Sequence, residues 1–311
     1  MSLSTPIAFM IFNRPDLTEI VFEAIRQAKP KKLLVVADGP RFPQEVEKCE
    51  KSRSVIQKVD WEFEVLTNYS EINLGCKLRV SSGLDWVFSE VEEAIILEDD
   101  CVPAPSFFNF CETLLARYRQ DERIMMISGD NFQKGHKRTD YSYYFSKYAH
   151  IWGWASWQRA WQHYDVEMKT WPEYNKLGMI DSFCENKYEK KYWTDIFDRA
   201  FDGSINTWDY QWTYACWSQN GLSILPKANL VSNIGFRSDA THTIFENPWA
   251  QLPTNDIWEI AEPPFIVRHK DADAYTFDYL FGGKAMREQD NLLAKIRNQL
   301  SEAKRKIKSW V

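Results

Sequence analysis

The chain has 311 residues, of which 44% are hydrophobic and 26% charged, and its formal net charge is −6. This composition is ordinary for a globular protein, and the acidic balance argues against general binding to nucleic acid. No segment approaches the roughly 18 uninterrupted apolar residues of a membrane span, and the opening MSLSTPIAF lacks the pattern of a signal peptide.

Cysteine and tryptophan usage narrows the class further. The six cysteines show no CxxC or CxxH spacing, so zinc sites and a dense disulfide framework are not expected, and a cytoplasmic location fits. Tryptophan is unusually common: the chain has 14, and nine of them fall between Trp152 and Trp217. Such rings are typical both of ordinary cores and of surfaces that bind sugars.

The first part of the chain, residues 6–128, alternates short apolar runs with helical patterns. We predict strands at 6–12, 32–39, 63–67, 94–98 and 124–128, and helices at 16–28, 45–57, 78–90 and 106–120. This alternation predicts an α/β fold with a mostly parallel sheet flanked by helices.

Polar residues follow four of these strands: Asn13-Arg14, Asp38-Gly39, Glu98-Asp99-Asp100 and Asp130-Asn131. In a parallel sheet these positions lie on one edge, and ligands of open α/β sheets gather at the carboxyl ends of the strands. The sequence therefore predicts a binding site at that edge.

From about residue 140 the pattern becomes aromatic and irregular, with helices expected at 186–202 and 208–219. No linker rich in Gly or Ser separates the two parts. We therefore expect one domain over 1–283, with halves at 1–135 and 136–283.

The tail, 284–311, carries eight Lys or Arg against three Asp or Glu, which makes it +5 and the remainder −11. Its apolar residues are spaced 3, 4, 3, 4, 3, which predicts an amphipathic helix: Leu293, Ile296, Leu300, Ala303, Ile307 and Trp310. Two interpretations remain open. The helix packs on the body or on another chain, or it makes peripheral contact with the inner face of a membrane.

The acid cluster Glu98-Asp99-Asp100 needs a positive partner, because adjacent carboxylates repel one another and raise one another's pKa. A solvated turn is the ordinary explanation. The strand before the cluster is apolar throughout, however, so the acids leave the interior edge of the sheet. Mg²⁺ and Mn²⁺ bind to one or two carboxylates together with substrate phosphates, and such a cation shared between Asp100 and a diphosphate would relieve the repulsion.

Three segments carry a resemblance to a known family. ILEDDCVPAPSFFNF (96–110) resembles the segment of GT-A glycosyltransferases that contains the DxD site, in the EDD form of the N-acetylglucosaminyltransferase I type. IWGWASWQRAW (151–161) resembles the Gly-Trp segment of bacterial glycosyltransferase-like proteins, including hemolytic-protein-like ones. NTWDYQW (206–212) is similar to the Trp-Asp segment of the first type, although Tyr210 stands where that type has a second Asp. The resemblance runs from about residue 6 to 245.

The resemblance implies a GT-A fold, with 1–135 binding a nucleotide and 136–283 binding an acceptor. It implies that Asp100 binds the metal and that Glu98 and Asp99 hold hydroxyls of the donor. It also implies nucleotide contacts from the residues after the first two strands: Asn13, Arg14 and Asp38. Asn13 and Asp38 are also ordinary turn residues.

The segment NLGCKLR precedes a predicted helix. Gly75 would allow close backbone approach, and Lys77 or Arg79 would reach a diphosphate, because basic side chains are disfavoured at a helix N-terminus unless they face a ligand. A solvated pair is the alternative.

An inverting sugar transfer needs a carboxylate that takes the proton of the acceptor hydroxyl. We expect Asp209 to be this base, because an acid among aromatic residues has its pKa raised by desolvation. Asp130 and Asp239 remain rivals.

The last candidates come from the aromatic part of the chain. His242 lies in a run, NIGFRSDATH, that is similar to one in the bacterial proteins, and would be a second metal or diphosphate contact. Trp152, Gly153 and Trp154 would lie nearest the acceptor.

Three functions are compatible with these features. The first is a metal-dependent inverting glycosyltransferase that uses Mn²⁺ or Mg²⁺, a nucleotide-diphosphate sugar (UDP by resemblance) and a glycan, lipid-linked or protein acceptor, as in polysaccharide biosynthesis. The second is a sugar-phosphate nucleotidyltransferase, although the loop after the first strand, FNRPDL, lacks the glycines that usually grip a triphosphate. The third is a non-catalytic carbohydrate-binding or assembly protein.

Overall fold

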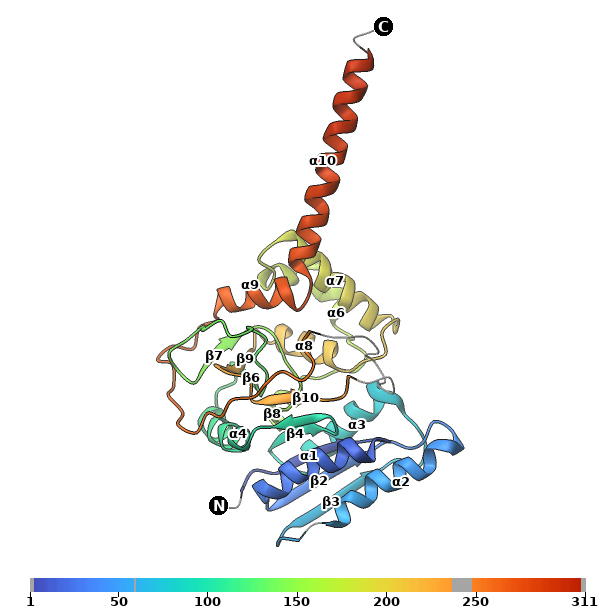
Figure 1. Cartoon of the computed structure of the whole chain (residues 1–311), viewed down its shortest axis with the longest axis vertical. Helices are drawn as coiled ribbons and strands as arrows, with labels where there is room; N and C mark the ends of the chain where they lie inside the picture. Colours follow the sequence, from blue (N-terminus) through green and yellow to red (C-terminus); the bar gives the residue numbers. More distant parts are fainter. Residues whose placement is uncertain (1–2, 59, 237–247, 309–311) are drawn as a thin grey trace.

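A computed structural model describes residues 3–58, 60–236 and 248–308 of the chain (Figure 1). Its centre is an eight-stranded sheet with the order β3-β2-β1-β4-β8-β6-β9-β7. The strands are β1 (Ile7–Ile11), β2 (Lys32–Ala37), β3 (Glu64–Tyr69), β4 (Glu93–Glu98), β6 (Ile124–Ser128), β7 (Tyr143–Ser146), β8 (Trp154–Trp157) and β9 (Leu222–Pro226). A small second sheet pairs β5 (Cys101–Pro103) with β10 (Val231–Asn233).

The sheet combines parallel and antiparallel pairs. β1 pairs in parallel with β2 and β4, β2 with β3, and β6 with β9. β8 runs antiparallel between β4 and β6, and β7 runs antiparallel to β9 at one edge. Because β8 is antiparallel to both of its neighbours, β4 and β6 point in the same direction. The predicted α/β fold with a mostly parallel sheet is therefore confirmed, and strands from both halves of the chain share the sheet.

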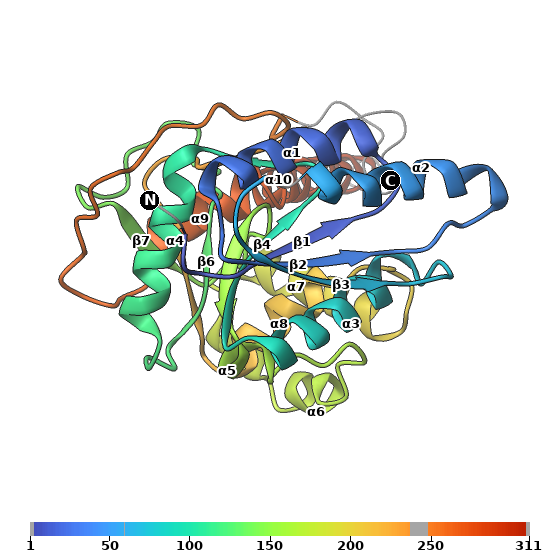
Figure 2. The ribbon, with the colours of Figure 1, turned by 90° about the horizontal axis from the view of Figure 1, so that it is seen from below.

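Helices cover both faces of the sheet, and Figure 2 shows α1 and α2 on one face and α3 on the other. The helices are α1 (Pro15–Ala28), α2 (Val46–Ser54), α3 (Gly75–Glu90), α4 (Pro105–Tyr118), α5 (Gln158–Trp161), α6 (Trp171–Lys176), α7 (Lys187–Phe201), α8 (Asp209–Ser218), α9 (Lys270–Tyr279) and α10 (Gly283–Lys308). Short 3-10 turns occupy Pro43–Glu45, Val55–Lys58 and Met179–Ser182.

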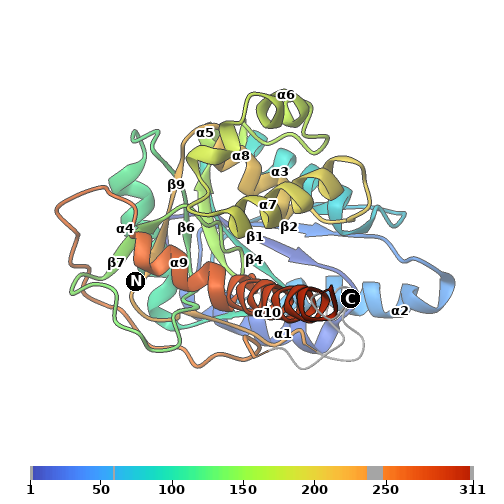
Figure 3. The same ribbon diagram turned by 90° about the horizontal axis from the view of Figure 1, so that it is seen from above.

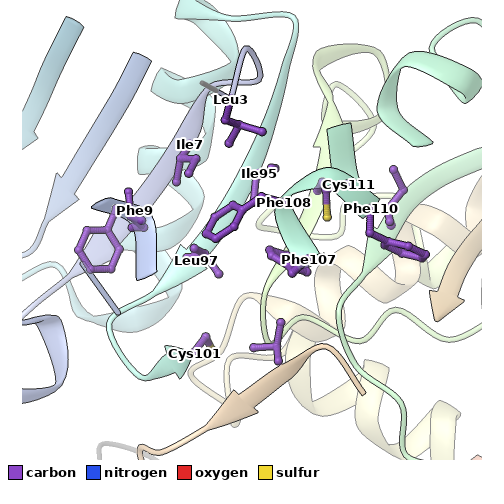
Figure 4. Packing of buried hydrophobic residues seen from close by; sticks show 14 of the residues in the cluster. Leu3, Ile7, Phe9, Ile95, Leu97, Cys101, Phe107, Phe108, Phe110 and Cys111 are labelled. Atoms are coloured by element: carbon purple, nitrogen blue, oxygen red, sulfur yellow. The ribbon is translucent and has the colours of Figure 1, made fainter. Parts of the chain in front are cut away.

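Alternate residues of the central strands pack into two separate cores. Ile7 and Phe9 of β1 face α1 and α4, whereas Ala8 and Met10 face α3. Figure 4 shows the first core, where Phe107 and Phe108 of α4 lie against β1 and β4. Every residue of β1 is buried, which explains why the strand reads as a continuous apolar run.

The aromatic half of the chain builds much of the second core. Six tryptophans have relative exposures below 2%: Trp154, Trp157, Trp171, Trp193, Trp212 and Trp217. Trp157 belongs to the first core and the other five to the second, where for example the rings of Trp154 and Trp212 lie 5.6 Å apart between centroids. Most of the tryptophan enrichment is therefore explained by the core.

The predicted C-terminal amphipathic helix is present as α10, and it extends away from the body of the molecule (Figures 1 and 3). Across the parts of the chain described here, no helix combines the length and apolar character needed to cross a membrane.

Candidate functional site

A pocket of about 550 Å³ lies at the carboxyl ends of β1, β2 and β4. The loops after these strands form one wall, and the N-terminus of α3, the segment before α8 and the strand end of β10 form the others. Among the described residues, those predicted for the site that line the pocket are Arg14, Asp38, Gly75, Arg79, Glu98, Asp99, Asp100, Trp152 and Asp209. Segments about 200 residues apart in the sequence thus meet in one cavity, as the strand-end argument predicts.

Arg14 is the positive group among the three acids. Its guanidinium forms ion pairs with Asp99 and with Asp100, the second at 3.0 Å between Nη1 and Oδ2. The backbone N–H of Phe12 also donates to Asp99. Burial lowers the pKa of Arg14, but its pairing with Asp99 and Asp100 outweighs that effect and raises the pKa above its usual value. The repulsion between Asp99 and Asp100 is therefore relieved within the protein itself.

Glu98 lies outside this pairing, and its pKa is raised further than that of Asp99. Burial, followed by repulsion from Asp100 and Asp99, raises the pKa of Glu98 to about 8. Burial also raises the pKa of Asp99, to about 6, although Arg14 opposes the shift. Glu98 is thus mostly protonated near pH 7 in the free protein, where it can donate as well as accept a hydrogen bond.

Asp100 faces the pocket with 13% of its side chain exposed. Gly235 packs directly against it: a Cβ added at residue 235 would lie 2.0 Å from Oδ2 of Asp100. Within the described ranges, no group of three or more His, Cys, Asp and Glu residues is arranged to hold a metal ion. The acids here therefore do not form a protein-only metal cage, but they fit a cation that takes one carboxylate and completes its coordination with phosphates.

Asp38 is occupied by backbone groups. Its carboxylate accepts hydrogen bonds from the N–H groups of Leu74 and Gly75 at 2.9 and 3.0 Å, and from the side chain of Asn73 at 3.0 Å. It therefore caps the start of α3 from a neighbouring strand. Asp38 is 7% exposed, so its predicted contact with a base or ribose would compete with this capping role.

The three predicted site residues at the start of α3, Gly75, Lys77 and Arg79, differ in whether they line the pocket. Gly75 has a φ of +75° and borders the pocket, as close backbone approach requires. Arg79 is buried and donates to the carbonyl of Ala37 and to Asn68, so it ties strand ends together. Of the residues described, Lys77 is not among those that line the pocket. The predicted diphosphate contact from Lys77 therefore has no support in this conformation.

The loop after β1 and the loop after β2 are joined through Glu45. Asn13 donates to Glu45 at 2.8 Å, and Arg41 forms an ion pair with the same carboxylate. Asn13 is not among the pocket-lining residues described, whereas Arg41 is. Sequence reasoning missed Arg41, although its position two residues after Asp38-Gly39 would have indicated it.

Asp209 lies in the first turn of α8 and lines the same pocket as the acid cluster, where its charge is among those that raise the pKa of Glu98. The hydroxyl of Thr207 donates to its carboxylate. Asp130 occupies a different environment: it is 0% exposed, does not line the pocket and, within the described chain, its Oδ1 has no hydrogen-bond partner. Burial raises its pKa well above the usual range. Of these two rivals, only Asp209 is placed to meet a ligand.

The three residues expected at the acceptor separate in the structure. Trp152 is partly exposed and lines the pocket, with its ring 5.4 Å from that of Phe236. Gly153 has a φ of +70° and lies against Val231 and Leu97, so it serves the turn into β8. Trp154 is 0% exposed and packs in the tryptophan core. The prediction of acceptor contact is therefore wrong for Trp154, because the turn at Gly153 separates Trp152, in the loop, from Trp154, which begins the buried strand β8.

Two predicted residues, His242 and Asp239, lie outside the described residues. The pocket also contains residues that sequence reasoning did not assign a role: Phe12, Asn73, Cys76, Ile151, Ile205, Thr207, Trp208, Tyr210 and Asn233. Most of them belong to loops beside the predicted positions, and no individual pattern in the sequence distinguishes them.

No protein-family model matches the chain, and no curated protein matches it in sequence. Among solved structures, the chain is similar to the crystal structure of UDP-glucose pyrophosphorylase complexed with UDP-glucose. The match has 9% identity and a TM-score of 0.35, and it covers 72% of this chain and 90% of that chain. A likeness this distant does not bear on the activity, which must be argued from the pocket itself.

Proposed function

We propose that the protein is a metal-dependent inverting glycosyltransferase with a GT-A fold, which moves a sugar from a nucleotide-diphosphate sugar to a glycan or lipid-linked acceptor. The observation that carries the proposal is the one pocket that is lined both by the strand-end acid cluster and by a separate carboxylate, Asp209, from another part of the chain. This arrangement suits a reaction that needs charge neutralisation at one end and proton removal at the other.

The acid cluster would bind the donor. Asp100 would hold Mn²⁺ or Mg²⁺ together with the diphosphate, and the bound cation would neutralise charge on the leaving phosphate. Glu98, with its raised pKa, would hydrogen-bond a donor hydroxyl. Arg14 would keep its pairing with Asp99 and offer its second nitrogen to the nucleotide.

The opposite wall would bind the acceptor. Asp209 would take the proton of the acceptor hydroxyl as that oxygen bonds to the anomeric carbon of the sugar. The bond between the anomeric carbon and the phosphate oxygen breaks in the same step, and the nucleoside diphosphate leaves with the electron pair. Trp152 would offer a flat apolar face to the acceptor sugar.

Calorimetry tests the metal role directly. UDP should bind to the native protein in the presence of Mn²⁺ and lose affinity when a chelator is added, and Asp100→Ala should remove this metal dependence. If UDP binds to Asp100→Ala, and to the native protein with chelator, as tightly as to the native protein with Mn²⁺, the assignment is wrong.

A thermal-shift panel of UDP-, GDP- and dTDP-sugars with and without Mn²⁺ identifies the nucleotide. Incubation with nucleoside triphosphate and sugar phosphate, with pyrophosphate as the readout, tests the nucleotidyltransferase alternative. A shift caused by glycans alone, indifferent to metal and nucleotide, would indicate a carbohydrate-binding protein without this activity.

A further inference from the structure

The base of α10 is fixed to the body of the molecule. Asp290 accepts a hydrogen bond from Tyr188 at 2.7 Å and pairs with Lys187 at 2.9 Å, both on α7. Arg287 forms an ion pair with Asp278 of α9, and Met286 packs against the aromatic core. The direction in which the helix leaves the body is therefore set by its first two turns (Figure 1).

Beyond Asp290, the apolar side of α10 is exposed. Leu292, Leu293, Ile296 and Leu300 have relative exposures of 58%, 44%, 43% and 59%. Figures 1 and 3 show this part of the helix extending beyond α7 and α9. An exposed row of leucine and isoleucine of this kind indicates a surface that another partner covers.

The charges beside this apolar row are positive. At about 100° per residue, Arg297 lies beside the row, about 40° from Leu293, whereas Lys295 lies on the far side of the helix, about 20° from Glu302. Glu302 is the single acid of segment 291–308, and the sequence after it carries Lys304, Arg305, Lys306 and Lys308. A helix with an exposed apolar row and an excess of Lys and Arg suits an interface between an apolar layer and anionic headgroups.

The same charges disfavour pairing with a second copy of the chain. The 3-4 spacing would place Leu293, Ile296 and Leu300 in a coiled-coil seam, with Arg297 and Lys304 in the flanking positions on one side. The other flank carries Leu292, Gln299 and Lys306. In a parallel pair Arg297 and Lys304 would face Leu292 and Gln299, and in an antiparallel pair Arg297 would face Lys304, so neither arrangement brings opposite charges together across this seam.

We propose that α10 binds an anionic lipid surface, with Leu293, Ile296 and Leu300 inserted below the headgroups and the flanking Lys and Arg residues contacting lipid phosphates. The tail carries +5 and the remainder of the chain −11, so the helix is the part of the molecule drawn to such a surface while the body is repelled from it. The helix spans roughly 39 Å at about 1.5 Å per residue, which holds the body beside the bilayer. The inference does not depend on the proposed function.

Vesicle flotation of the full chain tests this proposal. The native protein should float with phosphatidylcholine vesicles that contain phosphatidylglycerol, should not float with phosphatidylcholine alone, and should be released by high salt. Ile296→Asp with Leu300→Asp should lower partitioning at least ~10-fold, and Lys295→Glu with Arg297→Glu should do so by a similar factor.

A matched control is Leu177→Asp, because Leu177 is 60% exposed on the body, directly after α6. This variant should float like the native protein, and circular dichroism should show that all variants remain folded. Flotation that survives the Ile296 and Leu300 substitutions overturns the proposal. The native protein could instead fail to float with anionic vesicles, sediment as a dimer, and become monomeric when Ile296 and Leu300 are substituted. That result overturns the proposal in favour of self-association through α10.

Discussion

The two halves of the molecule use their distinctive residues differently. In the described part of residues 1–135, charged residues at the ends of β1, β2 and β4 reach the pocket, because strands buried on both faces leave no other place for charge. In residues 136–283, where tryptophan is enriched, most tryptophan rings pack in the core, and among the described tryptophans Trp152 and Trp208 border the pocket, together with the rings of Tyr210 and Phe236. A charged residue at the end of an apolar strand therefore indicates a binding site, whereas a tryptophan in an aromatic-rich segment does not distinguish a binding site from the core.

The largest expected effect tests whether the second half supplies the reactive group. Asp209→Asn should lower the rate of sugar transfer ~10²- to 10⁴-fold, the usual contribution of a general base, because the amide cannot accept the proton. Binding of UDP with Mn²⁺ should remain within about twofold of the native affinity, since the donor is proposed to bind to the acid cluster and not to Asp209. Steady-state transfer rates and calorimetry measure the two quantities.

Asp130→Asn is the matched control for this substitution. Asp130 is fully buried and, within the described parts of the chain, one of its oxygens is unpaired, so a neutral amide should raise the melting temperature and leave transfer unchanged. Because burial raises the pKa of Asp130, the native protein loses stability as the pH rises above the pKa that Asp130 has in the unfolded chain. The difference in melting temperature between Asp130→Asn and the native protein should therefore increase with pH. Loss of transfer in this variant would move the base assignment from Asp209 to Asp130.

The second prediction separates two neighbouring tryptophans. Trp154→Ala should destabilise the protein by ~3–5 kcal/mol, as expected for a large buried ring, because Trp154 is 0% exposed among Trp161, Trp208 and Trp212. Trp152→Ala should cost less in stability and instead raise the KM for the acceptor. Urea unfolding and acceptor titration measure the pair, and equal destabilisation by both substitutions would contradict the difference in their roles.

The sequence was sufficient to predict the parallel part of the sheet and the acids at its edge. It did not indicate β8, because four residues, WASW, are too short to carry a periodicity that distinguishes a strand. It also did not indicate that Arg14, 85 residues before Asp99, pairs with both Asp99 and Asp100. Contacts of this kind depend on the packing of β1 against β4, which no local pattern records. The cation expected between Asp100 and a diphosphate stays a prediction.

The third prediction concerns a close contact between the two halves, at Gly235 and Asp100. Gly235→Ala should weaken metal-dependent binding of UDP about tenfold, or ~1.4 kcal/mol, because its Cβ would lie 2.0 Å from Oδ2 of Asp100 and displace that carboxylate. Calorimetry of the double variant provides the control. If Gly235 acts through Asp100, adding Gly235→Ala to Asp100→Ala should weaken binding no further.

The smallest expected effect is on stability, and it concerns His150, a buried residue of the second half. His150 is 4% exposed, its ring lies 4.8 Å from that of Phe132, and its Nε2 has no hydrogen-bond partner in the described structure. Burial lowers its pKa to about 3. The folded state therefore keeps His150 neutral while the unfolded state takes up a proton below about pH 6.5, so acid favours unfolding through this residue.

His150→Phe should remove this penalty while keeping a ring of similar size in place. Between pH 7 and pH 5.5 the native protein should lose about 1 kcal/mol more stability than the variant does, as measured by urea unfolding at each pH. Asp130 and Asp273, whose pKa values are raised by burial, act in the opposite direction, but they are present in both proteins and cancel in the difference. If the free energy of unfolding changes equally with pH in the two proteins, His150 is accessible to protons in the folded state and belongs with the pocket residues instead of with the core.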